Sequence, residues 1–242
     1  MRLIWTYSKE WKRGENIAKY SHEYIQYLYK KSITSASKEY HKVIYTDEEN
    51  VGIFEGIVDQ VIVRNPKPFV FLADLKFEIA ELLDGEMLIT DGDIFYKNKL
   101  SVPKNIPLGF EVEIQEVRPK VLNWKNILIQ HGIVSEVPIW NIDNSSSINL
   151  GLMYFNDDKL KSKLINEYKK TQKFYIDYIE PIYKFNQKGK QFSACGSQML
   201  VKQFLIHENI TPYLFMNDKN KNFIHYSSST KVKYLQLFNE TV

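Results

Sequence analysis

The fold is decided by the stretch Met87-Leu88-Ile89-Thr90-Asp91-Gly92-Asp93, in which an uninterrupted apolar run ends in two carboxylates separated by one glycine. Such a run is the pattern of a strand that is buried on both faces, as in a parallel sheet. Residues 75–83, just before it, carry apolar side chains at helical spacing, and Asp84-Gly85 follows as a stop signal. A helix followed by a buried strand favours an α/β fold.

Working outward, the N-terminal part repeats this alternation. Strands are predicted at residues 2–7, 42–46 and 61–63, and Tyr20, Tyr24, Tyr27 and Leu28 mark one face of a helix; these segments complete the predicted N-terminal pattern. Strands separated by helices imply parallel pairing. We therefore expect a mostly parallel central sheet flanked by helices.

Beyond residue 100 the pattern changes. Phe110 and Val112 alternate with Glu111 and Glu113, which predicts a half-exposed antiparallel strand with the polar side chains on its exposed face. The remaining expected elements are a buried strand at 150–155, helices at 157–183 and 198–207, and a flexible break at 187–190.

Composition excludes several classes of protein. The chain has 242 residues, and 32 Lys and Arg against 29 Asp and Glu give a net charge of +3, which excludes a binder that works by bulk electrostatics but leaves a local basic groove open. The single cysteine excludes a disulfide framework and a cysteine-based zinc site. No apolar run approaches the roughly 18 residues of a membrane-spanning helix, and we expect a cytoplasmic protein.

The acidic pair Asp91 and Asp93 follows the most buried strand at its carboxyl end, where ligands bind in open α/β sheets. Two carboxylates separated by one small residue can both reach one hard divalent cation, and Gly92 permits close approach of the backbone. The alternative is a simple turn, because Asp-Gly is a common hairpin dipeptide. The strand context favours a metal site.

The segments Asp74-Leu75-Lys76 and Met87 to Phe95 together resemble the core of GT-A glycosyltransferases, where a basic helix precedes a strand that ends in Asp-x-Asp. The resemblance implies a GT-A (Rossmann-like) sheet with a smaller mixed acceptor-side region. It implies that the carboxylates hold Mn²⁺ or Mg²⁺ on the diphosphate of a nucleotide-sugar. It also implies that Thr6 and Tyr7 border the nucleotide and that Lys76 approaches the donor.

Three later segments are similar, in order, to the glycogenin-like and lipopolysaccharide-sugar transferases: Asn149 to Phe155, Ser197-Gln198, and His225 to Lys231. Ser197 stands where that group carries an aspartate, and Ser228 stands where it carries a glycine. The missing carboxylate leaves a retaining or an inverting reaction open.

The resemblance implies one domain over residues 1–242, with 1–97 as the nucleotide-binding half and 98–242 as the acceptor-side and closing half. It implies three groups of site residues. Gln198 and Asp93 are catalytic; Thr6, Tyr7, Lys76, Asp91, Gly92, Asn149, Gly151 and Lys231 bind the nucleotide and donor sugar; and Asp91, Asp93 and His225 bind the metal.

The sequence thus predicts a metal-dependent transferase that moves a sugar from a nucleoside-diphosphate sugar, UDP-linked in most of the families it resembles. The acceptor is open between a glycan, a lipid-linked sugar, a protein and a modified DNA base. Asp143, Glu136 and Asp157 are unranked candidates for a general base.

Two alternatives remain from the residues. A nucleotidyltransferase also uses paired aspartates, but residues 7–14 match its glycine-rich loop only weakly. A non-catalytic carbohydrate- or nucleic-acid-binding protein is suggested by the 14% aromatic content and by the lysine-rich segment 159–173. The simplest interpretation of those lysines is a solvated helix face.

Overall fold

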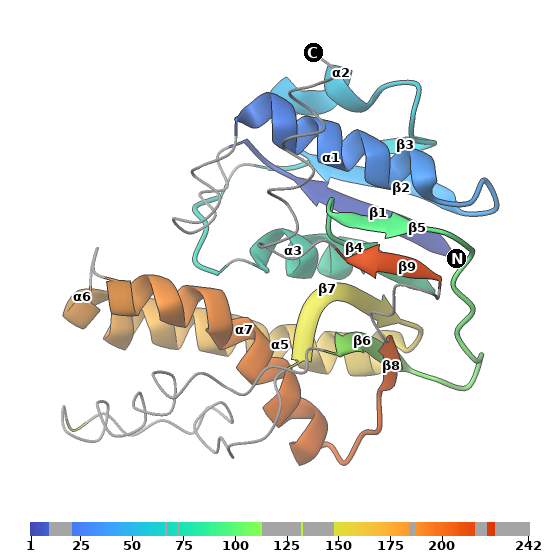
Figure 1. The fold of residues 1–242 in the computed structure, drawn as a ribbon. Coiled ribbons are helices and arrows are strands. Elements are labelled where there is room, and N and C mark those ends of the chain that lie inside the picture. The colour runs from blue at the N-terminus through green and yellow to red at the C-terminus, as the bar shows by residue number, and fades with distance from the viewer. Residues whose placement is uncertain are drawn as a thin grey trace.

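The computed structural model describes residues 1–9, 21–65, 67–71, 73–112, 132, 148–183, 187–215 and 222–225. Its central sheet has seven strands in the order β3-β2-β1-β4-β7-β6-β8, and a second sheet pairs β5 with β9 (Figure 1). The strands are β1 (Arg2–Tyr7), β2 (His41–Thr46), β3 (Gln60–Val63), β4 (Met87–Thr90), β5 (Ile94–Tyr96), β6 (Leu108–Val112), β7 (Ile148–Phe155), β8 (Tyr213–Phe215) and β9 (Phe223–His225).

The central sheet is mostly parallel. β3, β2, β1 and β4 pair in parallel, and so do β6 and β8. β7 is antiparallel to both of its neighbours, β4 and β6. Thus β7 is the one strand of the described sheet that runs against the others. The predicted α/β class with a mostly parallel sheet is confirmed.

Helices cover both faces of this sheet. They are α1 (His22–Ser35), α2 (Val51–Phe54), α3 (Asp74–Leu82), α5 (Asp158–Phe174), α6 (Glu180–Tyr183) and α7 (Gln187–His207), with the short turns η1 (Glu48–Asn50) and η3 (Tyr175–Ile179), the latter a π-helix that continues α5. Along β1 the side chains alternate, as a strand requires. Trp5 packs in the cluster that α1 closes, and Ile4 packs in the cluster that α3, α5 and α7 close (Figure 1).

Among the described residues the predicted elements of the N-terminal half are present, and Tyr20, from the predicted helical face, lies outside these residues. β4 is fully buried, as its uninterrupted apolar run predicts. The break predicted at residues 187–190 is wrong, because these residues form the first turn of α7. Gln and Lys are good helix formers, and an isolated glycine costs a helix only about 1 kcal/mol. The packing of Leu200 and Phe204 later in α7 supports the helix.

In the part of the chain that the structure describes, no helix combines the length and the apolar character needed to cross a membrane.

Candidate functional site

The site lies where the strand order of the sheet reverses. From β1 the chain builds β2 and β3 on one side and then returns to place β4 on the other side of β1. The carboxyl ends of β1 and β4 therefore flank a topological switch point, the position at which open α/β sheets bind ligands. Tyr7 ends β1, and Asp91 directly follows β4.

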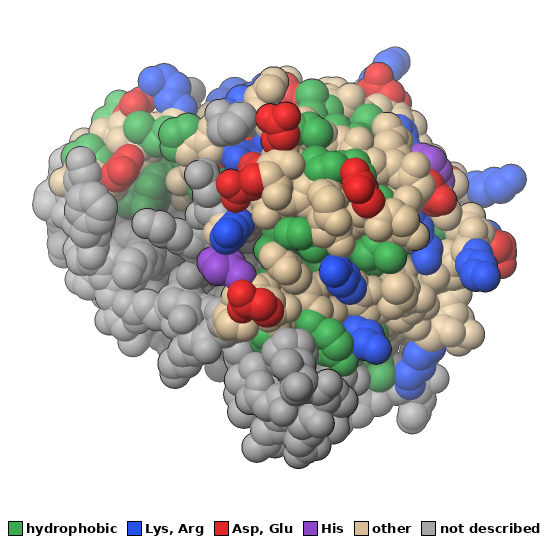
Figure 2. Space-filling model, turned by 90° about the horizontal axis from the view of Figure 1, so that it is seen from above, with side chains coloured by type: hydrophobic (Ala, Val, Ile, Leu, Met, Phe, Trp, Pro, Cys, Tyr) green, Lys and Arg blue, Asp and Glu red, His purple; other side chains and the backbone are tan. Residues whose placement is uncertain are grey.

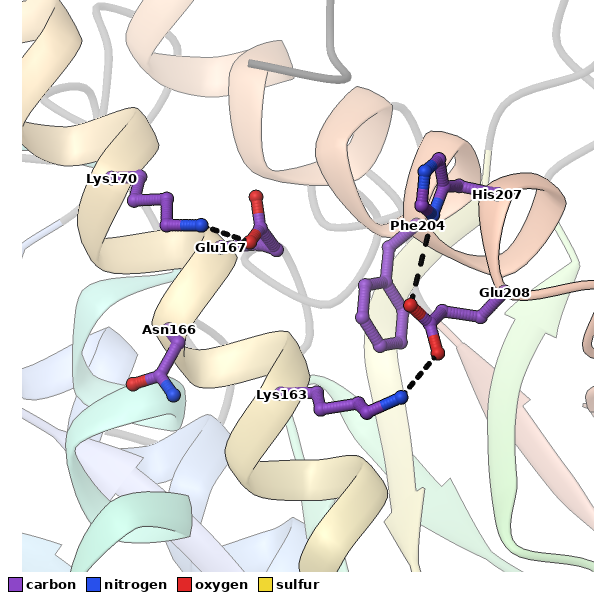
Figure 3. A pocket seen from close by; sticks show the side chains of 7 residues that line it. All are labelled: Lys163, Asn166, Glu167, Lys170, Phe204, His207 and Glu208. Carbon is purple, nitrogen blue, oxygen red and sulfur yellow. Dashed lines mark hydrogen bonds and ion pairs between the residues drawn. The ribbon is translucent and has the colours of Figure 1, made fainter. Parts of the chain in front are cut away.

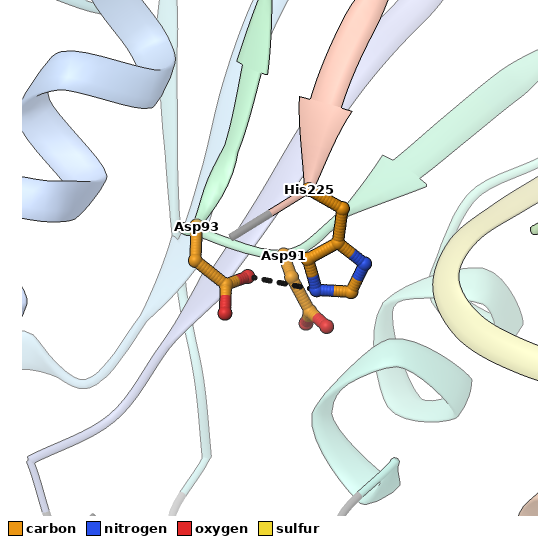
Figure 4. Close-up of side chains that lie close together, drawn as sticks. All are labelled: Asp91, Asp93 and His225. Atoms are coloured by element: carbon orange, nitrogen blue, oxygen red, sulfur yellow. Dashed lines mark ion pairs between the residues drawn. The ribbon is translucent and has the colours of Figure 1, made fainter. Parts of the chain in front are cut away.

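Three side chains converge beside this point. Asp91 and Asp93 belong to the turn between β4 and β5, and His225 is the last residue of β9. The register of β9 on β5 places His225 opposite Ile94, and this brings its ring to Asp93, with Nε2 3.5 Å from Oδ1 (Figure 4). The ligand atoms of all three residues lie within 4.8 Å of one another.

Gly92 is required by packing rather than by its backbone conformation. A Cβ on Gly92 would lie 2.5 Å from Cγ of Tyr29 and closer still to two other atoms of that ring. Tyr29 is buried, and its hydroxyl donates a hydrogen bond of 2.7 Å to the carbonyl of Thr6. The ring of Tyr29 thus fixes the turn that carries both aspartates against the end of β1.

Lys76 is buried at the floor of the site. Its ammonium ion-pairs with Asp91 Oδ1 at 2.7 Å and donates to the carbonyls of Leu150 and Gly151. The backbone amide of Asp91 donates to the same Gly151 carbonyl at 2.9 Å. Since an ammonium has three hydrogens and three protein acceptors surround this one, Lys76 orients the Asp91 carboxylate.

β7 is irregular where it meets the site. Phe110 pairs with Met153 but the next residue, Glu111, pairs with Asn149, so the register of β6 on β7 shifts at this point. Asn149 Oδ1 accepts a 2.8 Å hydrogen bond from the amide of Gly151. Irregularities of this kind redirect backbone and side chains next to active sites. The carbonyl of Gly151 itself accepts from the Asp91 amide because the register of β4 on β7 continues one residue beyond the pair of Thr90 and Leu152.

Glu111 was missed by the sequence pattern. The alternation in β6 predicts an exposed glutamate, but Glu111 is 1% exposed, so that prediction is wrong. Both of its carboxylate oxygens lie 2.8 Å from Nδ1 of His225. Burial raises the pKa of the Glu111 carboxyl, and the hydrogen bond from His225 acts against that shift. Its partner, His225, lies on β9, 114 residues further along the chain, and the alternating pattern of a single strand does not indicate such a contact.

The charges of the cluster favour a cation. Burial by itself would lower the pKa of the His225 imidazole, but the carboxylates of Asp93 and Glu111 outweigh it and hold that pKa well above its ordinary value. Three carboxylates, those of Asp91, Asp93 and Glu111, face one ammonium and one imidazole. Two carboxylate oxygens and one imidazole nitrogen within 4.8 Å form a donor set that fits Mn²⁺ or Mg²⁺.

Other predicted site residues are not joined to this cluster. Gln198 is half-buried on α7, and among the described residues no hydrogen bond or ion pair links it to Asp91, Asp93 or His225. Lys231 lies outside the described residues, as do Glu136 and Asp143. Asp157 caps α5 by accepting a 3.0 Å hydrogen bond from the amide of Leu160, which gives its carboxylate a structural function.

The solvated face predicted for the lysines of α5 is confirmed except at Lys161; the exposed lysines are Lys159, Lys163, Lys169, Lys170 and Lys173. Lys161 is 2% exposed and ion-pairs with Asp84 and Asp158. Other lysines of this helix pair with acids too. On the face of the molecule seen from above in Figure 2, Lys and Arg side chains are likewise interspersed with Asp and Glu. Neutralised lysines weaken the case for a basic nucleic-acid groove on α5.

A pocket of about 660 Å³ opens between α5 and α7 (Figure 3). Its lysines are neutralised, because Lys163 pairs with Glu208 at 2.7 Å and Lys170 pairs with Glu167 at 2.6 Å. None of its lining residues belongs to the predicted site. We therefore place the candidate site at the aspartates and not at this pocket.

Comparison with solved structures finds several transferases to which the chain is similar. The chain is similar to galactosyltransferase LgtC, with 13% identity and a TM-score of 0.45 over 80% of this chain and 70% of that one. It is similar to mouse xyloside xylosyltransferase 1, with 12% identity and a TM-score of 0.43 over 90% of this chain and 84% of that one. It is also similar to an inositol-1-phosphate CTP transferase from T. maritima, with 12% identity and a TM-score of 0.45 over 98% of this chain and 94% of that one. No protein-family model and no curated protein matches the chain. With TM-scores below 0.5, these likenesses assign no function, which must come from the site.

Proposed function

We propose that the protein is a metal-dependent glycosyltransferase that transfers a sugar from a nucleoside-diphosphate sugar, UDP-linked, to an acceptor. The observation that carries the proposal is the convergence of Asp91, Asp93 and His225 at the carboxyl end of β4, next to the switch point of the sheet. A nucleoside diphosphate leaves with charge developing on its phosphates, and a divalent cation supplies the Lewis acid that neutralises it.

In this proposal each residue near the cation has one task. Asp91, Asp93 and His225 hold the cation, and Lys76 keeps the Asp91 carboxylate in one orientation through its 2.7 Å ion pair. Lys231 is proposed to bind phosphate, as its segment implies. Fixed charges placed before the reaction stabilise the leaving group without a cost of reorganisation.

The nucleoside is proposed to lie at the carboxyl ends of β1 and β2, beside Thr6 and Tyr7. Four buried polar atoms support this placement, because they have no hydrogen-bond partner in the described structure; they are Ser8 Oγ, Thr46 Oγ1, Asp47 Oδ2 and Asn50 Nδ2. A buried polar group without a partner is costly unless water or a ligand satisfies it. Residues 1–97 are therefore assigned as the nucleotide-binding half.

The donor sugar is proposed to lie toward Asn149, Gly151 and Gln198 in the half formed by residues 98–242. The location of α7 supports this assignment, because α7 packs against β7, the strand that carries Asn149 and Gly151. Amide side chains such as those of Asn149 and Gln198 position sugar hydroxyls by hydrogen bonds. The acceptor is a glycan, a lipid-linked sugar, a protein or a modified DNA base.

The test is a thermal-shift panel with UDP, GDP and CDP, each with Mn²⁺, with Mg²⁺ and with EDTA. A ligand at about 100 times its Kd stabilises a protein by roughly 2.7 kcal/mol. We expect one nucleotide to raise the melting temperature of the wild type with Mn²⁺ but not with EDTA. Asp93→Asn should abolish this shift, while Asp177→Asn, which changes an exposed ion pair with Lys173, should leave it intact.

The other functions give other results. A nucleotidyltransferase would respond to a nucleoside triphosphate and release pyrophosphate, whereas the proposed enzyme releases the nucleoside diphosphate from its sugar donor. A protein that responds to no nucleotide would contradict the proposal. The aspartates would then be a turn, and a screen of glycans and DNA would test a binding protein.

A further inference from the structure

Glu111 is a buried carboxylate that the proposed roles of Asp91, Asp93 and Lys76 leave unused. It lies on β6, is 1% exposed, and has His225 as the partner of both oxygens. A buried charge is expensive and is retained where a specific partner compensates it. The function of Glu111 therefore lies in its effect on the imidazole of His225.

The contact fixes which nitrogen of His225 carries the proton. An ionised carboxylate only accepts hydrogen bonds, so Nδ1, at 2.8 Å from both Glu111 oxygens, must be the donor. The other nitrogen, Nε2, points at Asp93 Oδ1 at 3.5 Å. A cation held with Asp91 and Asp93 would meet Nε2 and displace the proton of that nitrogen to solvent, while the other proton stays on Nδ1 in its hydrogen bond to Glu111.

Gly151 makes room for this pair. A Cβ on Gly151 would lie 2.9 Å from Cε1 and 3.2 Å from Nδ1 of His225, and closer still to the Glu111 carboxylate. The register shift between Phe110 and Glu111 lies at the same place on the two strands. The backbone of β6 and β7 is thus shaped around the contact between the carboxylate and the imidazole, at the side of the ring that faces away from the aspartates.

We propose that Glu111 is a positioning residue, which orients the His225 imidazole and fixes its proton on Nδ1 so that Nε2 serves as the metal ligand. The inference rests on the proposed function, because it presupposes that Asp91, Asp93 and His225 bind a divalent cation. Carboxylates that hold metal-binding histidines in this way change metal affinity by about 10–100-fold when they are removed.

The experiment is a titration of the metal-free protein with Mn²⁺, followed by electron paramagnetic resonance of the free ion, without nucleotide and again with UDP. We expect Glu111→Gln to raise the Kd for Mn²⁺ by about 10–100-fold. Glu86→Gln is the matched control, since Glu86 precedes β4 at the end opposite Asp91 and accepts a 3.0 Å hydrogen bond from Tyr154. It should bind Mn²⁺ as the wild type does.

Melting curves in EDTA separate positioning from structural support. If Glu111 only stabilised the fold, Glu111→Gln would melt at a lower temperature in EDTA and yet bind Mn²⁺ with the wild-type Kd, and this result would overturn the inference. If the wild type binds no Mn²⁺ at all, the proposed function fails. If the wild type binds and Asp93→Asn does not, an unchanged Kd in Glu111→Gln refutes the positioning role alone.

A second measurement needs no variant at Glu111, so it tests the position of the His225 proton even if Glu111→Gln does not fold. In nitrogen NMR spectra of the wild type loaded with Mg²⁺, the His225 imidazole should be protonated on Nδ1 and unprotonated on Nε2. The signal is assigned by its loss in His225→Asn. A His225 ring that carries its proton on Nε2 would contradict the inference.

Discussion

Substitution of Gly92 by alanine tests the idea that Tyr29, and not backbone conformation, demands a glycine between the two aspartates. The new methyl would lie 2.5 Å from Cγ of Tyr29, a distance that forces the ring to move. Overpacking of a core costs about 1–3 kcal/mol, and the lost hydrogen bond from Tyr29 to the Thr6 carbonyl costs about 1 kcal/mol more. We expect Gly92→Ala to lose about 3 kcal/mol of stability.

At about 2–4 °C per kcal/mol for a protein of this size, that loss lowers the melting temperature by roughly 6–12 °C in EDTA. Gly52→Ala is the control, because Gly52 lies in α2 with no atom within 4 Å of a new Cβ, and alanine there should be neutral or stabilising. In a Tyr29→Ala background, Gly92→Ala should cost much less, as a double-mutant cycle would show. A Gly92→Ala protein as stable as Gly52→Ala would refute the packing argument.

Three further predictions concern other parts of the molecule. Gly151→Ala should displace the His225 ring, 2.9 Å from the new Cβ, and weaken Mn²⁺ binding in the same titration; an unchanged Kd would contradict this. Asp157→Ala removes the cap of α5, so it should cost about 1 kcal/mol in urea unfolding and leave sugar transfer unchanged, whereas lost turnover at full stability would make Asp157 a candidate base. Burial raises the pKa of Tyr40 from 10.0 to about 12. The folded state therefore holds this proton more tightly, and its contribution to stability is complete below pH 10 and lost as the pH rises through 12. The free energy of unfolding, measured between pH 10 and pH 12, should fall less in Tyr40→Phe than in the wild type.

The sequence predicted the N-terminal half of the fold well because the signals there are local. β4 is an uninterrupted apolar run with all four residues buried, and α3 follows the helical spacing of its apolar residues. Burial on both faces of a parallel strand leaves a composition that a single sequence displays directly. The position of Asp91 and Asp93 follows from the end of that strand, so this part of the site was also predictable.

The remainder depends on contacts between distant segments. The first turn of α7 is polar and contains Gly189, so its local pattern predicts a break, but the buried residues that follow hold the whole helix in place. Lys161 belongs to a lysine-rich helix face by sequence, yet Asp84 and Asp158 pair with it and it is 2% exposed. Tertiary packing overrides local propensity at both places.

Glu111 shows why one residue of the candidate site could not be predicted. An alternating strand is a sound reason to expect an exposed glutamate, and that reasoning fails only when a polar partner is buried on the same face. His225 becomes that partner through the pairing of β9 with β5, and space for the contact comes from Gly151 on β7. Because the carboxylate, the imidazole and the glycine come from three strands far apart in the chain, their interaction depends on the register of the folded sheets. In the metal-binding cluster, Asp91 and Asp93 are thus marked by the local sequence and His225 by the family resemblance. The contact of Glu111 with His225 can be recognised only in the assembled molecule.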